Sequence, residues 1–124
     1  MTNKVNKKIY KYEDLEILRH LDKKQDVSQR ELAEMMGISL GKINFILNAL
    51  INKGAIKVTN FKNNKNKLAY AYYLTPAGIK EKAFLTIKFF QRKTKEYDTI
   101  RRQIEELEKD MKKNNLEDMD LSNE

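Results

Sequence analysis

Amide and lysine side chains are the residues of this chain whose types and spacing could do chemistry. Asn44 and Asn48 are four residues apart, so on a helix both lie on one face. Each carboxamide carries a donor and an acceptor, a pair that matches the N6 and N7 edge of adenine. Lys42 offers a charged donor to guanine O6 and N7 or to a phosphate. These types predict recognition by hydrogen bonds and charge.

Catalytic chemistry, in contrast, lacks its usual residues. The chain has no Cys and one His, His20, and it has no glycine-rich phosphate loop. His20 lies near the predicted end of a helix, where a charge–dipole or surface role is typical. Without Cys, disulfides and thiolate metal sites are excluded. We therefore expect no enzyme, no cofactor and no metal.

A predicted helix-turn-helix over residues 28–54 must position these side chains. Ser28 and Glu31 form a capping box that starts a helix, and Gly37 suits the left-handed residue that ends it. Ser39 then caps a second helix, which Gly54 ends. One face of that helix is apolar: Ile43, Ile46, Leu47, Leu50 and Ile51. The pattern predicts a helix-turn-helix, although similar hairpins occur in all-α proteins that bind nothing.

The outward side of the second helix supplies the DNA-contact candidates. Gly41 allows close approach to a groove, and Phe45 could touch a thymine methyl or, alternatively, pack in the core beside Ile46. The N-terminus of the first helix favours phosphate contacts. The recognition-helix candidates are Ser39, Leu40, Gly41, Lys42, Asn44, Phe45 and Asn48, and the phosphate candidates are Ser28, Gln29 and Arg30.

After Gly54 the apolar period changes from 3.6 to 2. Residues 56–61 and 69–74 alternate in the manner of two strands, which predicts a hairpin, and Asp26-Val27 could add a short strand. The loop between them consists of Lys62, Asn63, Asn64, Lys65, Asn66 and Lys67. Such a loop alone is typical of a soluble turn, but beside a helix-turn-helix it predicts a basic wing that positions the domain on DNA.

A supporting helix from Tyr12 is expected before this motif, with Leu15, Ile17, Leu18 and Leu21 on one side. After it, Thr75 and Pro76 predict the start of a long helix. Its first apolar residues should pack back on the domain: Ile79, Ala83, Phe84, Ile87 and Phe90. If this helix runs unbroken to Asp110 it is about 50 Å long, more than a small domain can cover.

The distal part of the long helix carries a heptad seam. Its members step by 7, 3, 4, 3 and 4 residues, and they are Phe90, Tyr97, Ile100, Ile104, Leu107 and Met111. Lys93 and Asn114 interrupt the second seam position at either end. The seam predicts a dimerisation coiled coil whose partner is a second copy of the chain or another protein.

Charge divides unevenly along the 124 residues. The net charge of +7 lies wholly in residues 1–75, with 14 Lys and Arg against 7 Asp and Glu, whereas residues 76–124 hold 11 of each. No acidic residue occurs from Met35 to Lys80, which suits a phosphate-binding surface. No long apolar run or signal peptide is present, so we expect a cytoplasmic protein without membrane attachment.

The predicted fold is mainly α with a small β-hairpin wing, a winged helix-turn-helix followed by a long C-terminal helix. Residues 1–11 form a flexible basic segment, 12–75 the winged domain, 76–111 the dimerisation helix and 112–124 a flexible acidic tail. A winged-helix module that binds a protein partner through the wing and long helix is the alternative to a DNA-binding protein.

Two segments resemble a known family: SQRELAEMMGISLGKINFILNALINKG and KLAYAYYLTPAGIKEKAFLTIKFFQRKTKEYDTI. They are similar to the MarR family of winged-helix regulators, in the small branch linked to exopolysaccharide gene clusters. The resemblance covers about Leu15 to Ile104 and implies a dimeric, DNA-binding transcription regulator of a pseudo-palindromic operator, with polysaccharide-related genes as targets. Larger members begin with a further helix that contributes to the dimer and a ligand cleft. Here only about a dozen residues precede the first helix, so the resemblance implies dimerisation through the C-terminal helix and carries over no small-molecule effector.

Overall fold

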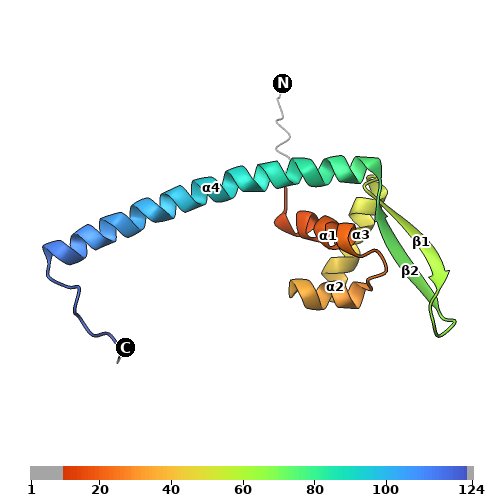
Figure 1. The fold of residues 1–124 in the computed structure, drawn as a ribbon, viewed down its shortest axis with the longest axis horizontal. Coiled ribbons are helices and arrows are strands. Elements are labelled where there is room, and N and C mark those ends of the chain that lie inside the picture. Colours follow the sequence, from red (N-terminus) through yellow and green to blue (C-terminus); the bar gives the residue numbers. More distant parts are fainter. Residues whose placement is uncertain (1–9, 123–124) are drawn as a thin grey trace, which may run out of the picture. The chain divides into compact units, whose positions relative to one another are not determined.

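The computed structural model describes residues 10–122, so most of the segment expected to be flexible at the N-terminus lies outside the described residues. The elements follow in the order α1 (Tyr12–Lys23), α2 (Gln29–Met36), α3 (Leu40–Asn52), β1 (Ile56–Lys62), β2 (Leu68–Leu74) and α4 (Pro76–Lys113) (Figure 1). The predicted fold class is confirmed: a mainly helical chain with a two-stranded hairpin and a long C-terminal helix. The chain divides into two compact units, one up to Ile87 and one from Lys88.

The predicted helix caps are confirmed. The Ser28 hydroxyl accepts the Glu31 amide at 3.0 Å, and the Glu31 carboxylate accepts the Ser28 amide at 2.8 Å. Gly37 ends α2 with φ 67°, a left-handed conformation that glycine adopts without a steric penalty. The Ser39 hydroxyl accepts the Lys42 amide at 3.1 Å and so begins α3. Local sequence therefore fixes both ends of the turn between α2 and α3.

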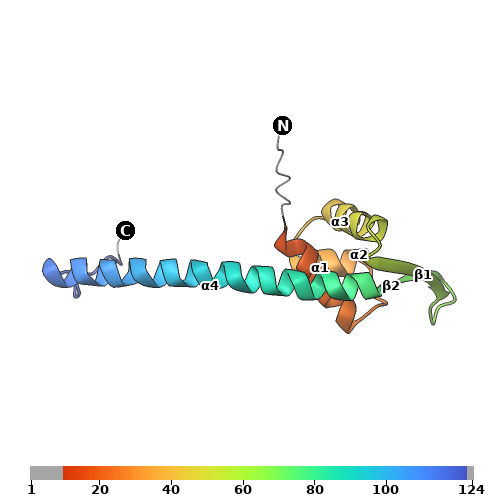
Figure 2. The ribbon, with the colours of Figure 1, turned by 90° about the horizontal axis from the view of Figure 1, so that it is seen from above.

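The core of the first unit is apolar and draws on every element. The predicted inward face of α1 is confirmed, and α3 contributes the predicted face except for Ile51, which is half-buried. Its fully buried side chains are Ile17, Leu18, Leu21, Leu32, Ile43, Leu47, Leu50 and Leu85. The helices α1, α2 and α3 gather at one end of the hairpin, whose turn extends away from them (Figure 1, Figure 2).

Strands β1 and β2 pair antiparallel, from Ile56 with Leu74 to Lys62 with Leu68. The strand considered at Asp26-Val27 is wrong, because in the described chain the sheet has two strands. One backbone bond replaces it, in which the Tyr72 amide donates to the Gln25 carbonyl at 2.9 Å. The segment serves burial instead, since the Val27 side chain lies in the core.

The start of α4 is capped by Thr75, whose hydroxyl accepts the Gly78 amide at 3.0 Å and donates to the Gly54 carbonyl. The stripe expected to pack back on the domain is wrong: Ile79 is 57% exposed and Ile87 58% exposed, and Ala83, Phe84 and Phe90 are also exposed. Gly78 decides which face turns inward, because a Cβ there would lie 2.0 Å from the Ala55 carbonyl oxygen. Leu85, seven residues later on the same side of the helix, is buried.

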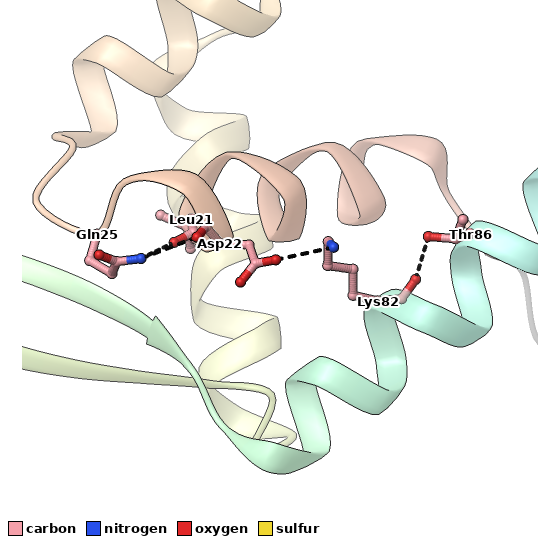
Figure 3. Close-up of polar contacts among 5 residues, drawn as sticks. All are labelled: Leu21, Asp22, Gln25, Lys82 and Thr86. Carbon is pink, nitrogen blue, oxygen red and sulfur yellow. Dashed lines mark hydrogen bonds and ion pairs between the residues drawn. The ribbon is translucent and has the colours of Figure 1, made fainter.

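One ion pair joins the end of α1 to the first turns of α4, and hydrogen bonds local to each element lie beside it (Figure 3). The Lys82 ammonium lies 3.1 Å from the Asp22 carboxylate, and the Thr86 hydroxyl donates to the Lys82 carbonyl at 2.7 Å. The Gln25 amide donates to the Leu21 carbonyl at 2.9 Å and so satisfies a carbonyl in the last turn of α1. These contacts all lie within the first unit.

The second unit contains the distal part of α4, which is helical without a break to Lys113, two residues beyond the expected end. Every residue from Phe90 to Asn115 is exposed. Asn115 is left-handed at φ 56°, and the Leu116 amide donates to the Met111 carbonyl at 2.8 Å, which closes the helix end. Among residues 10–122 no single helix has the length and apolar content to cross a membrane; α2 and α3 pass that test on length and composition only when counted together, and they meet at a bend of 112°.

Candidate nucleic-acid interface

The N-cap and the first nine residues of α3 carry the predicted contact residues on the outside. All seven are exposed: Ser39, Leu40, Gly41, Lys42, Asn44, Phe45 and Asn48. Phe45 is 71% exposed, so the alternative that it packs in the core beside Ile46 is wrong. The exposed Phe45 ring lies between Asn44 and Asn48 in sequence, so this face of the helix presents an apolar group as well as hydrogen-bonding groups.

A chain of hydrogen bonds orients the two asparagines. Asn48 Nδ2 donates to Asn44 Oδ1 at 3.2 Å, Asn44 Nδ2 donates to Gln29 Oε1 at 3.3 Å, and Gln29 Nε2 donates to the Tyr72 hydroxyl at 3.3 Å. Each carboxamide has two N–H donors and two oxygen lone pairs. Asn44 and Asn48 therefore each keep a donor and an acceptor for a ligand.

Tyr72 and Gln29 are site residues whose roles the sequence did not reveal. Tyr72 lies on β2, 43 residues from Gln29, and its ring is buried. Gln29 was expected to contact phosphate, but its half-buried amide is engaged by Asn44 and Tyr72. No local pattern predicts such a contact, because it depends on how β2 packs beside α2.

The other two phosphate candidates at the start of α2 differ from each other. The Ser28 hydroxyl and amide are both used in the capping box with Glu31, whereas the Arg30 side chain is exposed. The bond from the Ser28 amide holds the pKa of Glu31 below its usual value of 4.5, so the carboxylate stays ionised at this helix end. Arg30 is thus the phosphate candidate that the geometry leaves available.

Acidic residues from α1 and α4 pair with lysines of the segment Met35 to Lys80, which itself contains no acidic residue. The Lys42 ammonium lies 2.8 Å from the Glu13 carboxylate of α1, and the Lys53 ammonium lies 2.9 Å from the Glu81 carboxylate of α4. Asp14 also lies near Lys53, and burial raises the pKa of its carboxyl against the opposing effect of the lysine charge. The surface around α3 is therefore less positive than the sequence suggests.

The hairpin turn is built by its asparagines and leaves its lysines exposed. Asn63 Oδ1 accepts the amides of Lys65 and Lys67 at 2.9 and 3.0 Å, and Asn66 adopts φ 58°. Asparagine tolerates both roles, since its short amide bonds locally and suits left-handed backbone. Of the six predicted wing contacts, Asn63 and Asn66 therefore shape the turn, while Lys62, Asn64, Lys65 and Lys67 project from an ordered scaffold.

A hollow of about 650 Å³ lies between α3, the start of α2 and the hairpin. Its polar side includes Gln29 and Asn48, and its apolar side includes Leu68, Tyr70 and Tyr72. Leu68 is 62% exposed and Tyr70 is 50% exposed. The amide chain thus lies at the edge of a concave surface that the wing completes.

Comparison with known proteins agrees with this geometry. Residues 14–57, from α1 to the start of β1, match the family of winged helix-turn-helix DNA-binding domains. No curated protein matches the sequence. Over residues 14–57 the chain thus carries a winged helix-turn-helix DNA-binding domain.

Solved structures of MarR-family regulators share the fold. A mutant of MepR from a multidrug-resistant S. aureus clinical isolate is 22% identical to this chain, with a TM-score of 0.53. The match covers 86% of this chain and 74% of that chain. PcaV from Streptomyces coelicolor is 16% identical at TM-score 0.53, covering 77% and 78%. FabT from Streptococcus pneumoniae, solved in complex with DNA, is 16% identical at TM-score 0.51, covering 88% and 80%. At these identities the likeness shows the fold alone.

Proposed function

We propose that this protein is a sequence-specific, double-stranded DNA-binding transcription regulator that acts as a homodimer on a pseudo-palindromic operator. The observation that carries the proposal is the exposed pair Asn44 and Asn48, oriented on α3 through Gln29 and Tyr72. A carboxamide held in one orientation discriminates between base edges, whereas a freely rotating one does so poorly. Such an arrangement serves sequence recognition.

The remaining site residues divide into reading and positioning roles. With the first half of α3 in the major groove, Asn44, Asn48 and Phe45 meet base edges. The wing lysines meet the neighbouring sugar–phosphate backbone, where they add affinity but no sequence information. Lys42 also contacts the backbone once its ion pair with Glu13 breaks. Its side chain is 46% exposed, so a phosphate can reach its ammonium group. Arg30 contacts phosphate from the start of α2.

DNA titration at two salt concentrations tests the DNA-binding part of the proposal. A protein that neutralises several phosphates releases counterions, so its affinity falls steeply as salt rises. We expect this dependence for any duplex, with tighter binding to sequences enriched by selection from a random pool. Binding that is indifferent to salt and sequence contradicts the proposal.

Homodimerisation is proposed through the exposed apolar side chains of distal α4. We expect Ile104→Asp to separate the dimer in sedimentation experiments, because it places a charge in the seam. Thr99→Asp introduces the same charge outside the seam and should leave the dimer intact. Equal effects of the two substitutions would contradict dimerisation through this helix.

The resemblance to the exopolysaccharide-linked branch supports one class of target. We propose that the operator lies upstream of polysaccharide-related genes and that the protein acts in the cytoplasm, where DNA is accessible. Operators selected with the purified protein, compared with sequences upstream of such genes, test this target class. No small-molecule effector is part of the proposal.

A protein-binding winged helix is the second candidate, and exposed apolar side chains on the hairpin favour it. Leu68 and Tyr70 present apolar surface beside the hollow, which phosphates do not require. This candidate predicts weak DNA binding and no sequence preference. The salt titration therefore separates the two candidates.

A further inference from the structure

The order of apolar and charged residues along the exposed seam of α4 favours one orientation of its partner helix. From Phe90 to Asn115 every residue is exposed, and the apolar members repeat at heptad spacing on one continuous helix. Phe90, Tyr97, Ile104 and Met111 occupy the first seam position, and Ile100 and Leu107 the second. The inference below rests on the proposed homodimer, so the partner helix is a second copy of α4.

The residues that flank the seam on its two sides are charged in a specific order. One flank holds Glu96, Gln103 and Asp110, and the other holds Thr94, Arg101 and Glu108. In a parallel, in-register pair each residue of the first flank faces the residue five positions later on the second copy. Glu96 of each copy then faces Arg101 of the other, and Gln103 faces Glu108 without repulsion.

We infer that two α4 helices pair in parallel and in register, with Glu96 of each copy beside Arg101 of the other. In this arrangement each of the six apolar seam residues meets its own counterpart, so no exposed apolar side chain of the seam is left in water. In one of the two apolar heptads, Ile104 at the first seam position and Leu107 at the second form the combination that favours two-stranded parallel coils.

The antiparallel pairing with greatest overlap is disfavoured by charge. Residues on the same flank then face each other, which places Arg101 against Arg101 and Glu96 against Asp110 of the other copy. It also places Met111 opposite Lys93. Like charges at close range oppose association, and a lysine opposite a methionine leaves apolar surface poorly covered.

Antiparallel pairings shifted by one heptad cover the seam less completely. One shift brings Arg101 to Glu108, but it leaves Phe90 facing chain beyond the helix end at Lys113 and sets Tyr97 against Asn114. The opposite shift forms no pair of opposite charges and sets Lys93 against Ile104. Of these pairings, the parallel register alone matches all six apolar seam residues with apolar partners and also forms the Glu96–Arg101 pair.

Lys93 lies at a seam position in all of these pairings, and in the parallel pair it faces Lys93 of the other copy. Its ammonium lies 3.5 Å from the Glu96 carboxylate of its own helix, so its charge is directed to the flank where Glu96 lies. In the parallel pair Glu96 therefore lies between Lys93 of its own copy and Arg101 of the other. A polar seam residue of this kind lowers stability but disfavours other registers.

Cysteine cross-linking of the full chain tests the orientation, because the natural chain has no Cys. In the parallel pair, Met111→Cys and Tyr97→Cys each lie beside their own counterpart and should form a covalent dimer on mild oxidation. Lys109→Cys, on the outer side, is the matched control and should not. In the full-overlap antiparallel pair the two Met111 positions are about 27 Å apart, at 1.5 Å per residue over 18 residues.

Charge exchange supplies a second readout that needs no cross-link. Arg101→Glu should weaken the dimer about three- to tenfold in sedimentation, and adding Glu96→Arg to it should restore the affinity. Recovery in the double variant supports the Glu96–Arg101 contact. A double variant no tighter than the single one overturns it.

The outcomes separate this inference from the proposed function. A dimer that cross-links only when Met111→Cys chains are mixed with Lys93→Cys chains overturns the parallel orientation and leaves the homodimer standing. A chain that stays monomeric overturns both the homodimer and its orientation. Salt-dependent DNA binding, measured on the same samples, reports separately on whether the protein binds DNA.

Discussion

The Lys42 ammonium on α3 lies 2.8 Å from the Glu13 carboxylate on α1. Both side chains are partly exposed, so the pair is worth little to stability, on the order of 0.2 to 1 kcal/mol. The pair matters more for binding than for stability. It occupies the one charged side chain among the contact candidates of α3 with a carboxylate from α1. At the proposed interface, a phosphate or a guanine would compete with Glu13 for Lys42.

Glu13→Gln should therefore tighten DNA binding about two- to fivefold at low salt, since Lys42 is freed and one negative charge is removed. The gain should shrink as salt rises, because screening already weakens the pair. Fluorescence anisotropy with cognate and unrelated duplexes measures it. Glu105→Gln removes the same charge on distal α4, and an equal gain there would show that net charge alone is responsible.

Asn44→Ala should lose affinity selectively for the cognate site, by roughly 1 to 3 kcal/mol, because a base-edge hydrogen-bond pair is removed. Lys65→Ala should instead weaken all duplexes about equally and lower the salt slope by about 1. Titrations of both variants on matched and scrambled duplexes provide the comparison. Equal losses on every sequence from both changes would refute the assignment of reading to α3.

Tyr72→Phe tests whether the buried hydroxyl positions the reading amides. The ring stays in the core, but Gln29 loses the acceptor of its 3.3 Å bond and with it part of its hold on Asn44. Cognate affinity should fall by up to about 1 kcal/mol while affinity for unrelated DNA stays constant. Tyr73→Phe, on the more exposed neighbouring residue, is the control; a similar loss there would argue against a positioning role for Tyr72.

Two helical glycines make opposite predictions when replaced by alanine. At Gly78 the new Cβ would meet the Ala55 carbonyl at 2.0 Å, so Gly78→Ala should lower the free energy of unfolding by about 1 to 3 kcal/mol. Nothing lies within 4 Å of a Cβ at Gly41, so Gly41→Ala should raise it by about 0.5 to 1 kcal/mol. Urea unfolding measures both. If Gly41→Ala also weakens cognate binding, the backbone of α3 approaches the groove closely.

Glu31 and Asp14 should give opposite dependences of stability on pH. The pKa of Glu31 is lowered by the Ser28 amide, so its stabilising contribution is present above its unfolded value and is lost as pH falls through the folded pKa. The pKa of Asp14 is raised by burial, so its ionisation lowers stability as pH rises from its usual value of 3.8 through the folded pKa.

Unfolding experiments at neutral pH and below pH 4.5 compare the neutral variants. Glu31→Gln should be less stable than the natural chain at neutral pH, and the difference should shrink in acid. Asp14→Asn should gain stability relative to the natural chain as pH rises. If the stability differences of both variants from the natural chain change in the same direction with pH, the pKa shift assigned to Glu31 or to Asp14 is wrong.

Local patterns predicted the secondary structure because they depend on neighbours in sequence. The Ser28–Glu31 box, Gly37 and Ser39 each act within four residues, and the structure confirms all three. The prediction of a short strand at Asp26-Val27 was wrong because a strand, unlike a helix cap, depends on residues far away in sequence. A strand needs a partner edge, and within the described residues β2 offers one backbone bond here, from the Tyr72 amide to the carbonyl of Gln25 just before this segment.

Apolar spacing on α4 predicted a helix but not its buried face. Ile79, Phe84 and Ile87 are three large apolar residues at helical spacing, whereas Gly78 on the inward side has no side chain, so the sequence favoured the wrong stripe. Gly78 decided otherwise, since the absence of a side chain lets the helix backbone approach Ala55. Steric fit between two backbones overrode hydrophobic spacing at this position.

The sequence by itself determined the capped helical pair, the hairpin with its basic turn, the exposed heptad seam and the amide pair on one helical face, because each depends on residues close together in the chain. The tertiary structure alone decided which groups meet those residues: Glu13 at Lys42, Glu81 at Lys53, and Tyr72 behind Gln29 and Asn44. These partners are 28 to 43 residues apart in sequence, and only packing of α1, β2 and the start of α4 around α2 and α3 brings their charges and hydroxyl within bonding distance.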